Sequence, residues 1–176
     1  MKTLFNVFAA FGFLFFALKP IESNAQTTRK ERQANKVAAV AKMVNDTNYV
    51  FEANYANPLR GGQRMLTSEY DFRVTKDTIT AFLPYFGVAY MAPNDPSTNE
   101  GGIKFTSTKF IYSAKQKKNG SWIISIKPKD NNIIDWRDVH SLTLSVSPDG
   151  YADLQVDSSN RDAISFYGEL VAAAKK

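Results

Sequence analysis

The stretch that decides the fold is residues 139–157, which reads VHSLTLSVSPDGYADLQVD. Its first half alternates apolar residues with serine and threonine, and its second half alternates alanine, leucine and valine with polar residues. A period of two predicts half-buried strands. Between them, Ser147-Pro148-Asp149-Gly150 predicts a type I turn closed by a left-handed glycine. The segment therefore predicts an antiparallel hairpin.

Similar apolar or alternating runs occupy most of residues 48–171, at 49–55, 66–74, 78–86, 103–114, 121–128 and 162–170. In the first of these runs, Tyr49, Phe51, Ala53 and Tyr55 are expected to share one face. Asn119-Gly120 predicts a two-residue type I′ turn, in which both residues have positive φ. About eight strands joined by short turns predict an all-β antiparallel meander. We expect it to curl into a small lipocalin-like barrel, with a two-sheet β-sandwich as the alternative.

A single helix is expected before the strands, within residues 26–47. Thr28-Arg29-Lys30-Glu31 matches a capping box, and Val37, Val40, Ala41 and Val44 then recur with helical spacing. Asn45-Asp46-Thr47-Asn48 is expected to end the helix, because these side chains compete for backbone hydrogen bonds. The valine stripe lacks large anchoring residues, so we expect it to pack on the sheet.

Residues 1–25 have the order of a secretory signal peptide. Lys2 is followed by a nearly apolar run from Leu4 to Leu18, and Ser23-Asn24-Ala25 offers small residues for cleavage before Gln26. The apolar run is shorter than the roughly 20 residues that span a bilayer as a helix. We therefore expect a periplasmic or secreted protein that is soluble after cleavage and is not inserted in the membrane.

The composition narrows the class of protein. The chain has no cysteine, which excludes disulfides and acylation at a lipoprotein cysteine, so the domain must be stabilised by packing. A net charge of +5 without long blocks of one sign gives no indication of nucleic-acid binding. The usual sets of zinc ligands cannot be assembled with one histidine and no cysteine. We expect no metal and no cofactor.

The unusual run is Leu83 to Tyr90, because Pro84 cannot donate to a strand ladder and Gly87 allows the backbone to bend. Its aromatic residues precede the irregular segment 92–102. Two hypotheses stay open: a kink packed on the core, or an aromatic lip over a ligand cavity. In the second hypothesis the ligand-binding residues are Tyr85, Phe86 and Tyr90, extended by Tyr112 and Trp122.

No catalytic set is indicated. His140 shares its parity with Leu142, Leu144 and Val146, which predicts a half-buried structural histidine, and no nucleophile-elbow pattern is present. Glu69 and Asp71 have the separation of a glycosidase pair on one strand face. That face also carries Thr67 and Arg73, so an ordinary solvated face is the better interpretation.

The run Leu83–Tyr90 (LPYFGVAY), followed by Gly102-Ile103-Lys104-Phe105, resembles one known family. Tyr151-Ala152-Asp153-Leu154, Asn160-Arg161 and Ile164-Ser165-Phe166-Tyr167-Gly168 extend the similarity over about residues 45–170. The chain resembles the exported bacterial proteins grouped as domain of unknown function 4251. The resemblance implies a small β domain of the cell envelope, and it implies neither an activity nor catalytic residues.

Three functions follow as expectations. The first is a non-catalytic envelope protein that binds a small apolar molecule or a glycan. The second is a structural or protein-interaction module with a filled core, whose partner would be an envelope protein. A hydrolase is the least favoured, because no acid–base or nucleophilic set is indicated. An empty, aromatic-lined cavity would favour the first function, and a filled interior would favour the second.

Overall fold

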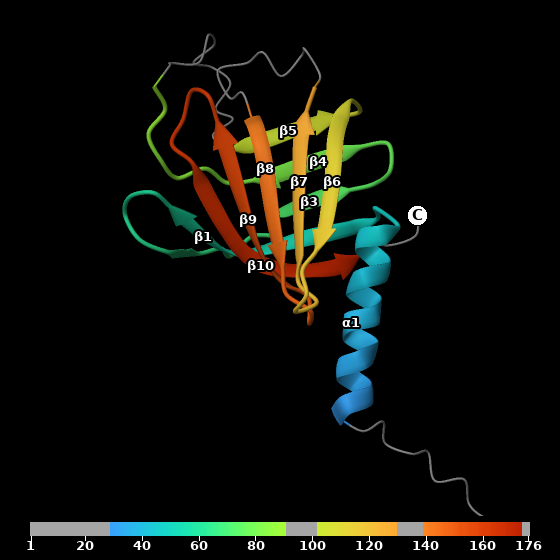
Figure 1. Cartoon of the computed structure of the whole chain (residues 1–176). Helices are drawn as coiled ribbons and strands as arrows, with labels where there is room; N and C mark the ends of the chain where they lie inside the picture. The colour runs from blue at the N-terminus through green and yellow to red at the C-terminus, as the bar shows by residue number, and fades with distance from the viewer. Residues whose placement is uncertain (1–28, 91–101, 130–138, 174–176) are drawn as a thin grey trace, which may run out of the picture.

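The computed structural model describes residues 29–90, 102–129 and 139–173 (Figure 1). The expected signal peptide, 1–25, lies outside these residues. The described part of the chain begins with helix α1 (Arg29–Asn45). Ten strands follow: β1 (Tyr49–Pro58), β2 (Arg64–Met65), β3 (Asp71–Val74), β4 (Ile79–Leu83), β5 (Ile103–Ser107), β6 (Phe110–Gln116), β7 (Trp122–Pro128), β8 (Val139–Val146), β9 (Tyr151–Ser158) and β10 (Ile164–Ala172).

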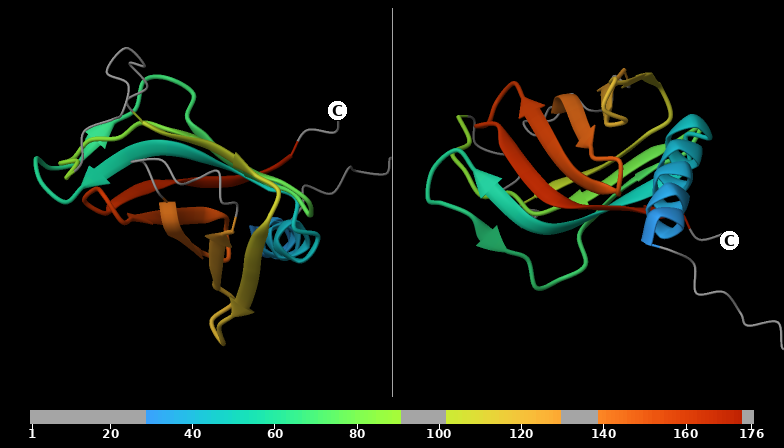
Figure 2. Two further views of the ribbon diagram at one scale, coloured as in Figure 1. Left: turned by 90° about the horizontal axis from the view of Figure 1, so that it is seen from above. Right: turned by 60° about the horizontal axis from the view of Figure 1, so that its bottom comes forward.

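The strands form one antiparallel sheet in the order β5-β4-β3-β1-β10-β9-β8-β7-β6, with β2 paired to β1. The pairing of β10 with β1 brings the end of the chain back to its beginning and nearly closes the meander into a barrel. Figures 1 and 2 show β3, β4 and β5 crossing behind β6 to β9. The all-β class, the single N-terminal helix and the curled meander are confirmed.

The opening in the barrel lies between β5 and β6, where the sequence predicted one strand over 103–114. Ser107, which is buried, turns the chain by donating its hydroxyl to the carbonyl of Lys109, at 3.0 Å. The carbonyl of Lys109 also accepts a hydrogen bond from the amide of Lys129, the residue that follows β7. The prediction of one strand over 103–114 was therefore wrong, because a side-chain hydrogen bond redirects the chain after Ser107.

The alternating residues meet in one core. Phe51, Phe72, Leu154 and Phe166, together with the other inward side chains, form a single buried cluster. Helix α1 adds only Val40 and Val44 to it, so the valine stripe packs on the sheet as expected. Its first eight residues, 29–36, are exposed, and Figure 1 shows this end of α1 projecting from the sheet. Among the described helices, none is long and apolar enough to cross a membrane.

Two bulges change the faces predicted by simple alternation. The register of β1 shifts between Ala53 and Tyr55, so Ala56 is buried and Tyr55 leaves the core face. The register of β8 shifts between Val139 and Ser141, and His140 is exposed rather than half-buried. Both predictions were wrong, because a bulge inserts one residue and reverses the parity of its neighbours.

Both expected hairpins are present, but the turn of one hairpin differs from the predicted type. Gly150 has a φ of 98° and donates to the carbonyl of Ser147, which confirms that turn. Gly120 has a φ of 82° and donates to Lys117, whereas Asn119 is not among the residues with positive φ. The type I′ prediction was therefore wrong. The longer loop needs positive φ only at its glycine.

Candidate functional site

The segment after β4 is held against the loop between β9 and β10. Ala89 forms a bridge with Arg161, the amide of Asp162 donates to Val88, and the amide of Tyr90 donates to Asn160. The Tyr85 hydroxyl donates to the carbonyls of Val88 and Asp162 at 3.0 and 3.1 Å. Strand β4 ends at Leu83, directly before Pro84, as the missing proline donor requires.

Two charged residues complete this cluster. Arg161 is 2% exposed; its guanidinium lies 4.6 Å from the centre of the Tyr85 ring and donates to the Gly102 carbonyl at 3.0 Å. Asp162 is also buried and accepts a hydrogen bond from the Tyr90 hydroxyl, which raises the Tyr90 pKa. Burial raises the pKa of Tyr85. Both tyrosines are therefore neutral donors that join two loops.

The structure separates the five predicted ligand residues. Tyr85 and Tyr90 contact the β9–β10 loop, and the Phe86 ring lies 4.7 Å from the Arg64 guanidinium. Tyr112 instead lies beside the end of α1, donating to the Val44 carbonyl at 3.3 Å.

These two regions are at opposite ends of the sheet. The Tyr49 hydroxyl bonds that of Tyr112 at 3.5 Å, and Tyr49 pairs with Val74, next to Ile79 at the start of β4. The Tyr85 segment follows the other end of β4. Trp122 is buried in the core on β7. A single aromatic lip over 85, 86, 90, 112 and 122 is therefore not formed.

The outer face of the sheet carries an aromatic surface instead. Tyr151 on β9 and Tyr167 on β10 are 51% and 40% exposed, and their rings are nearly parallel (11°) with centroids 6.3 Å apart. Both residues are exposed, so part of each ring remains open to solvent. An open groove of about 490 Å³ runs along them, and Ile123, Asp149, Asp153 and Lys117 are also in its lining. We call it the tyrosine groove.

Sheet register explains why these residues meet. Asp153 pairs directly with Tyr167, and Glu169 pairs directly with Tyr151, so all four side chains point to the outer face. Tyr167 also pairs with Tyr55, which the β1 bulge turned outward. Partial desolvation raises the pKa of the Asp153 carboxyl.

A second groove, of about 550 Å³, lies on the same outer face beside β3. Val50 and Val171 are in its lining, as are the polar residues Glu52, Glu69, Asp71 and Arg73. Glu169 pairs with Glu52 on one side and with Tyr151 on the other, so it lies between this β3 groove and the tyrosine groove.

The loop that covers the β3 groove was predicted as strand. The run 66–74 forms a strand only over 71–74. Tyr70 precedes that strand and is half-buried; it packs against the core, and its ring stacks on that of Phe82 with centroids 5.6 Å apart. Glu69 lies in the loop and not on the strand with Asp71. The expected shared strand face of these two carboxylates was therefore wrong.

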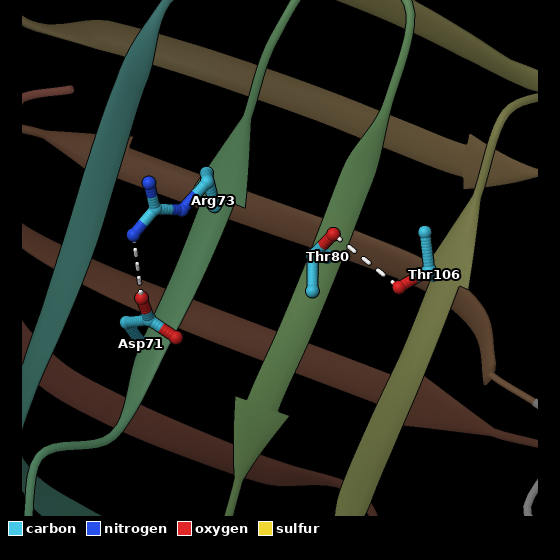
Figure 3. Close-up of polar contacts among 4 residues, drawn as sticks. All are labelled: Asp71, Arg73, Thr80 and Thr106. Carbon is cyan, nitrogen blue, oxygen red and sulfur yellow. Dashed lines mark hydrogen bonds and ion pairs between the residues drawn. The ribbon is translucent and has the colours of Figure 1, made fainter. Parts of the chain in front are cut away.

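Polar pairs extend across the outer face next to the β3 groove. Figure 3 shows Arg73 reaching Asp71 on the same strand, at 3.4 Å, and Thr80 beside Thr106 on β4 and β5, with hydroxyl oxygens 3.4 Å apart. The hydroxyl, carboxylate and guanidinium groups of these side chains are donors and acceptors for hydrogen bonds to a polar ligand. Within the described ranges, no three histidine, cysteine or acidic side chains converge in a way that could hold a metal ion.

Of the residues that line the tyrosine groove, only Trp122 was among the predicted ligand residues, and the groove itself was not predicted. The signal was present, since Tyr151 and Tyr167 have the outward parity of their strands. Exposed tyrosines at outward positions indicate a binding surface only when strand register places them side by side. Arg161 and Asp162 were likewise not proposed as partners of Tyr85 and Tyr90.

Comparison with protein families gives one match. The model of a family described as "Domain of unknown function (DUF4251)" matches residues 31–170, which includes α1 and almost all of the sheet. No curated protein matches the chain.

A solved structure has a similar fold. It is described as the crystal structure of a DUF4251 family protein from Bacteroides eggerthii DSM 20697. The similarity covers 80% of this chain and 91% of that one, with a TM-score of 0.57 and 17% sequence identity. At this identity the likeness concerns the fold alone.

Proposed function

The chain belongs to the DUF4251 family, a domain of unknown function, and on this fold we propose an exported, non-catalytic protein that binds an extended glycan across its outer face. The observation that carries the proposal is the pair Tyr151 and Tyr167, two large rings left open to solvent beside a groove. Exposed apolar surface gathered in one place is typical of a binding site.

A glycan suits the chemistry of this surface. A sugar ring offers an apolar face of C–H groups, which packs on an aromatic ring, and a rim of hydroxyl groups. Asp153 and Glu169, each directly opposite one of the tyrosines, are acceptors for those hydroxyls. The groove is open rather than enclosed, which suits a segment of a longer chain better than a small buried ligand.

The length of the surface supports an extended ligand. From β9 through β10 and β1 to β3 the sheet advances three strand spacings, or roughly 14 Å. Over that distance the tyrosine groove and the β3 groove follow one another, with Glu169 and Glu52 between them. An oligosaccharide lying across the strands would contact both grooves at once.

The interior supports a surface ligand rather than an internal apolar one. Inward side chains from strands on both sides of the barrel, among them Phe51, Phe72, Ile124 and Leu144, belong to one buried cluster. A ligand on the outer face requires no displacement of this packing. A buried core of this kind is compatible with a glycan-binding role on the outside.

Export and the absence of catalysis are also part of the proposal. Export is supported by the signal-peptide order of residues 1–25, which places the protein where glycans are abundant. A non-catalytic role is supported by the exposed position of His140 and by the ion pair that Asp71 forms with Arg73.

Titration of the purified protein with a panel of neutral oligosaccharides, followed by calorimetry, tests the function. We expect Tyr151→Ala and Tyr167→Ala each to weaken binding by about tenfold or more, since each removes one open ring. Tyr151→Phe keeps the ring and should bind nearly normally. Ile111→Ala is the matched control, because Ile111 is 53% exposed on β6 and outside both grooves. Equal binding by all four variants would refute the proposal.

A further inference from the structure

The charge along the two grooves is opposite in sign to that of the whole protein. The chain has a formal net charge of +5. Along the path of the two grooves, however, the carboxylates outnumber the cations: Asp149 and Asp153 line the tyrosine groove, Glu52, Glu69 and Asp71 line the β3 groove, and Glu169 lies between them. The basic residues lining these grooves are Lys117 and Arg73.

The arrangement of these carboxylates is not one that stabilises the fold. Glu52 stands directly opposite Glu169 on one side and directly opposite Asp71 on the other. Like charges directly opposite each other in a sheet are destabilising. Arg73 contacts Asp71 and so offsets part of the repulsion at one end of the row. The repulsion along the rest of the row would be relieved by a cationic ligand.

The tyrosines favour a cation independently of the carboxylates. The open face of a tyrosine ring attracts an ammonium group within about 6 Å of its centre. Tyr151 and Tyr167 present two such rings, each with a carboxylate directly opposite it in the sheet. Aromatic rings beside carboxylates are the chemistry by which proteins recognise ammonium ions.

We propose that the glycan bound in the tyrosine groove carries free amino groups, as in a chain of glucosamine units, rather than acetylated or acidic sugars. This inference rests on the proposed glycan-binding function and specifies its ligand class. The sugar rings lie on Tyr151 and Tyr167, and the ammonium groups face Asp153, Glu169 and Glu52. A basic peptide is less suitable, because extended peptides pair with the edge of a sheet and this surface is a face.

The test compares β-1,4-linked glucosamine oligomers with N-acetylglucosamine oligomers of equal length, at a mildly acidic pH at which the free amines are protonated. We expect the glucosamine oligomer to bind at least about tenfold more tightly, and added salt to reduce that preference. Glu169→Gln should lower the ratio of the two affinities toward one. Glu31→Gln, on the exposed start of α1, is the matched control and should leave the ratio unchanged.

Other results would overturn the inference in distinguishable ways. Equal binding of the two oligomers would refute the ammonium preference and leave the glycan-binding function standing. Binding of neither would refute both. Oligolysine of equal charge that competes as well as the glucosamine oligomer, with Tyr167→Ala binding both normally, would show a general polycation surface and would overturn the glycan ligand.

Discussion

Gly168 on β10 lies against the carbonyl group of Glu52 on β1 so closely that a Cβ atom at Gly168 would be 1.9 Å from the Glu52 oxygen. Gly168 pairs with Ala53, at the start of the β1 bulge. This contact joins the two strands that nearly close the barrel. It also places Glu52 and Glu169 opposite each other on the outer face.

Gly168→Ala should therefore destabilise the protein by about 1–3 kcal/mol, the usual range for overpacking in a well-packed region. The obstacle is backbone, which cannot rotate away as a flexible side chain can. Chemical denaturation measures the change, and Ser165→Ala on the same strand is the control. An unchanged free energy of unfolding would show that β1 and β10 separate more easily than their register suggests.

Thr47→Gly should stabilise the protein by about 0.5–1 kcal/mol. Thr47 lies just after α1 and has a φ of 49°, a conformation that is unfavourable for a β-branched residue. The amide of Asn48 donates to Met43 and that of Thr47 to Val44, the pattern that usually has glycine at this position. Thermal unfolding gives the comparison, and a lower melting temperature in the glycine variant would contradict the prediction.

Gly150→Val should cost about 1 kcal/mol or more, because valine resists the φ of 98° at this turn. A Cβ atom there would be in ordinary contact with Val40 of α1, 3.5 Å away, so the strain comes from the backbone. Differential scanning calorimetry of the variant measures the effect. If its melting temperature equals that of the wild type, the turn is less constrained than the structure indicates.

Tyr85→Ala should destabilise the fold by about 2 kcal/mol, below the range for removing a fully buried ring, because Tyr85 is half-buried. The ring packs under the Arg161 guanidinium, and its hydroxyl joins two loops. Glycan affinity should stay within about twofold of the wild type, because Tyr85 does not line the tyrosine groove. Denaturation and oligosaccharide titration are measured on the same sample. If the variant keeps its fold but no longer binds the glycan, the binding site includes the Leu83–Tyr90 segment, as proposed from the sequence.

Asp153 should make stability depend on pH in a defined direction. Its pKa is raised above 3.8 by desolvation, so the folded state retains a proton that the unfolded state releases. The free energy of unfolding therefore falls as pH rises from that value through the raised pKa. Asp153→Asn has no carboxyl group to ionise, so its stability should not fall with pH in this way. It should be more stable than the wild type at neutral pH but not below pH 3.8. Parallel denaturation curves at both pH values check the sign.

The period-two alternation was sufficient to predict the all-β class and the curled meander, because burial of one sheet face requires that pattern over every strand. The helix was predicted separately, from the helical spacing of its valines and the capping box before them. Gly150 and Pro84 likewise predicted a turn and a strand end from their own backbone limits. These are local properties, which a residue carries wherever it is placed. The membership in the DUF4251 family also followed from short runs of sequence.

The local pattern failed where a bulge inserted one residue or where a side chain bonded to the backbone. The bulges at Ala53 and His140 reversed the parity of neighbouring positions, and the hydrogen bond from the Ser107 hydroxyl to the Lys109 carbonyl divided one expected strand into two. None of these changes is visible in the period of the apolar residues, which reports only which positions are buried.

The candidate site depended on tertiary structure for the same reason. The sequence by itself determined that Tyr151 and Tyr167 point away from the core. Only strand register placed them beside each other, with Asp153 and Glu169 opposite them, and turned Tyr55 to the same face. Residues far apart in sequence become neighbours through backbone hydrogen bonds between strands, and those bonds are decided by the packing of the whole barrel rather than by any single segment.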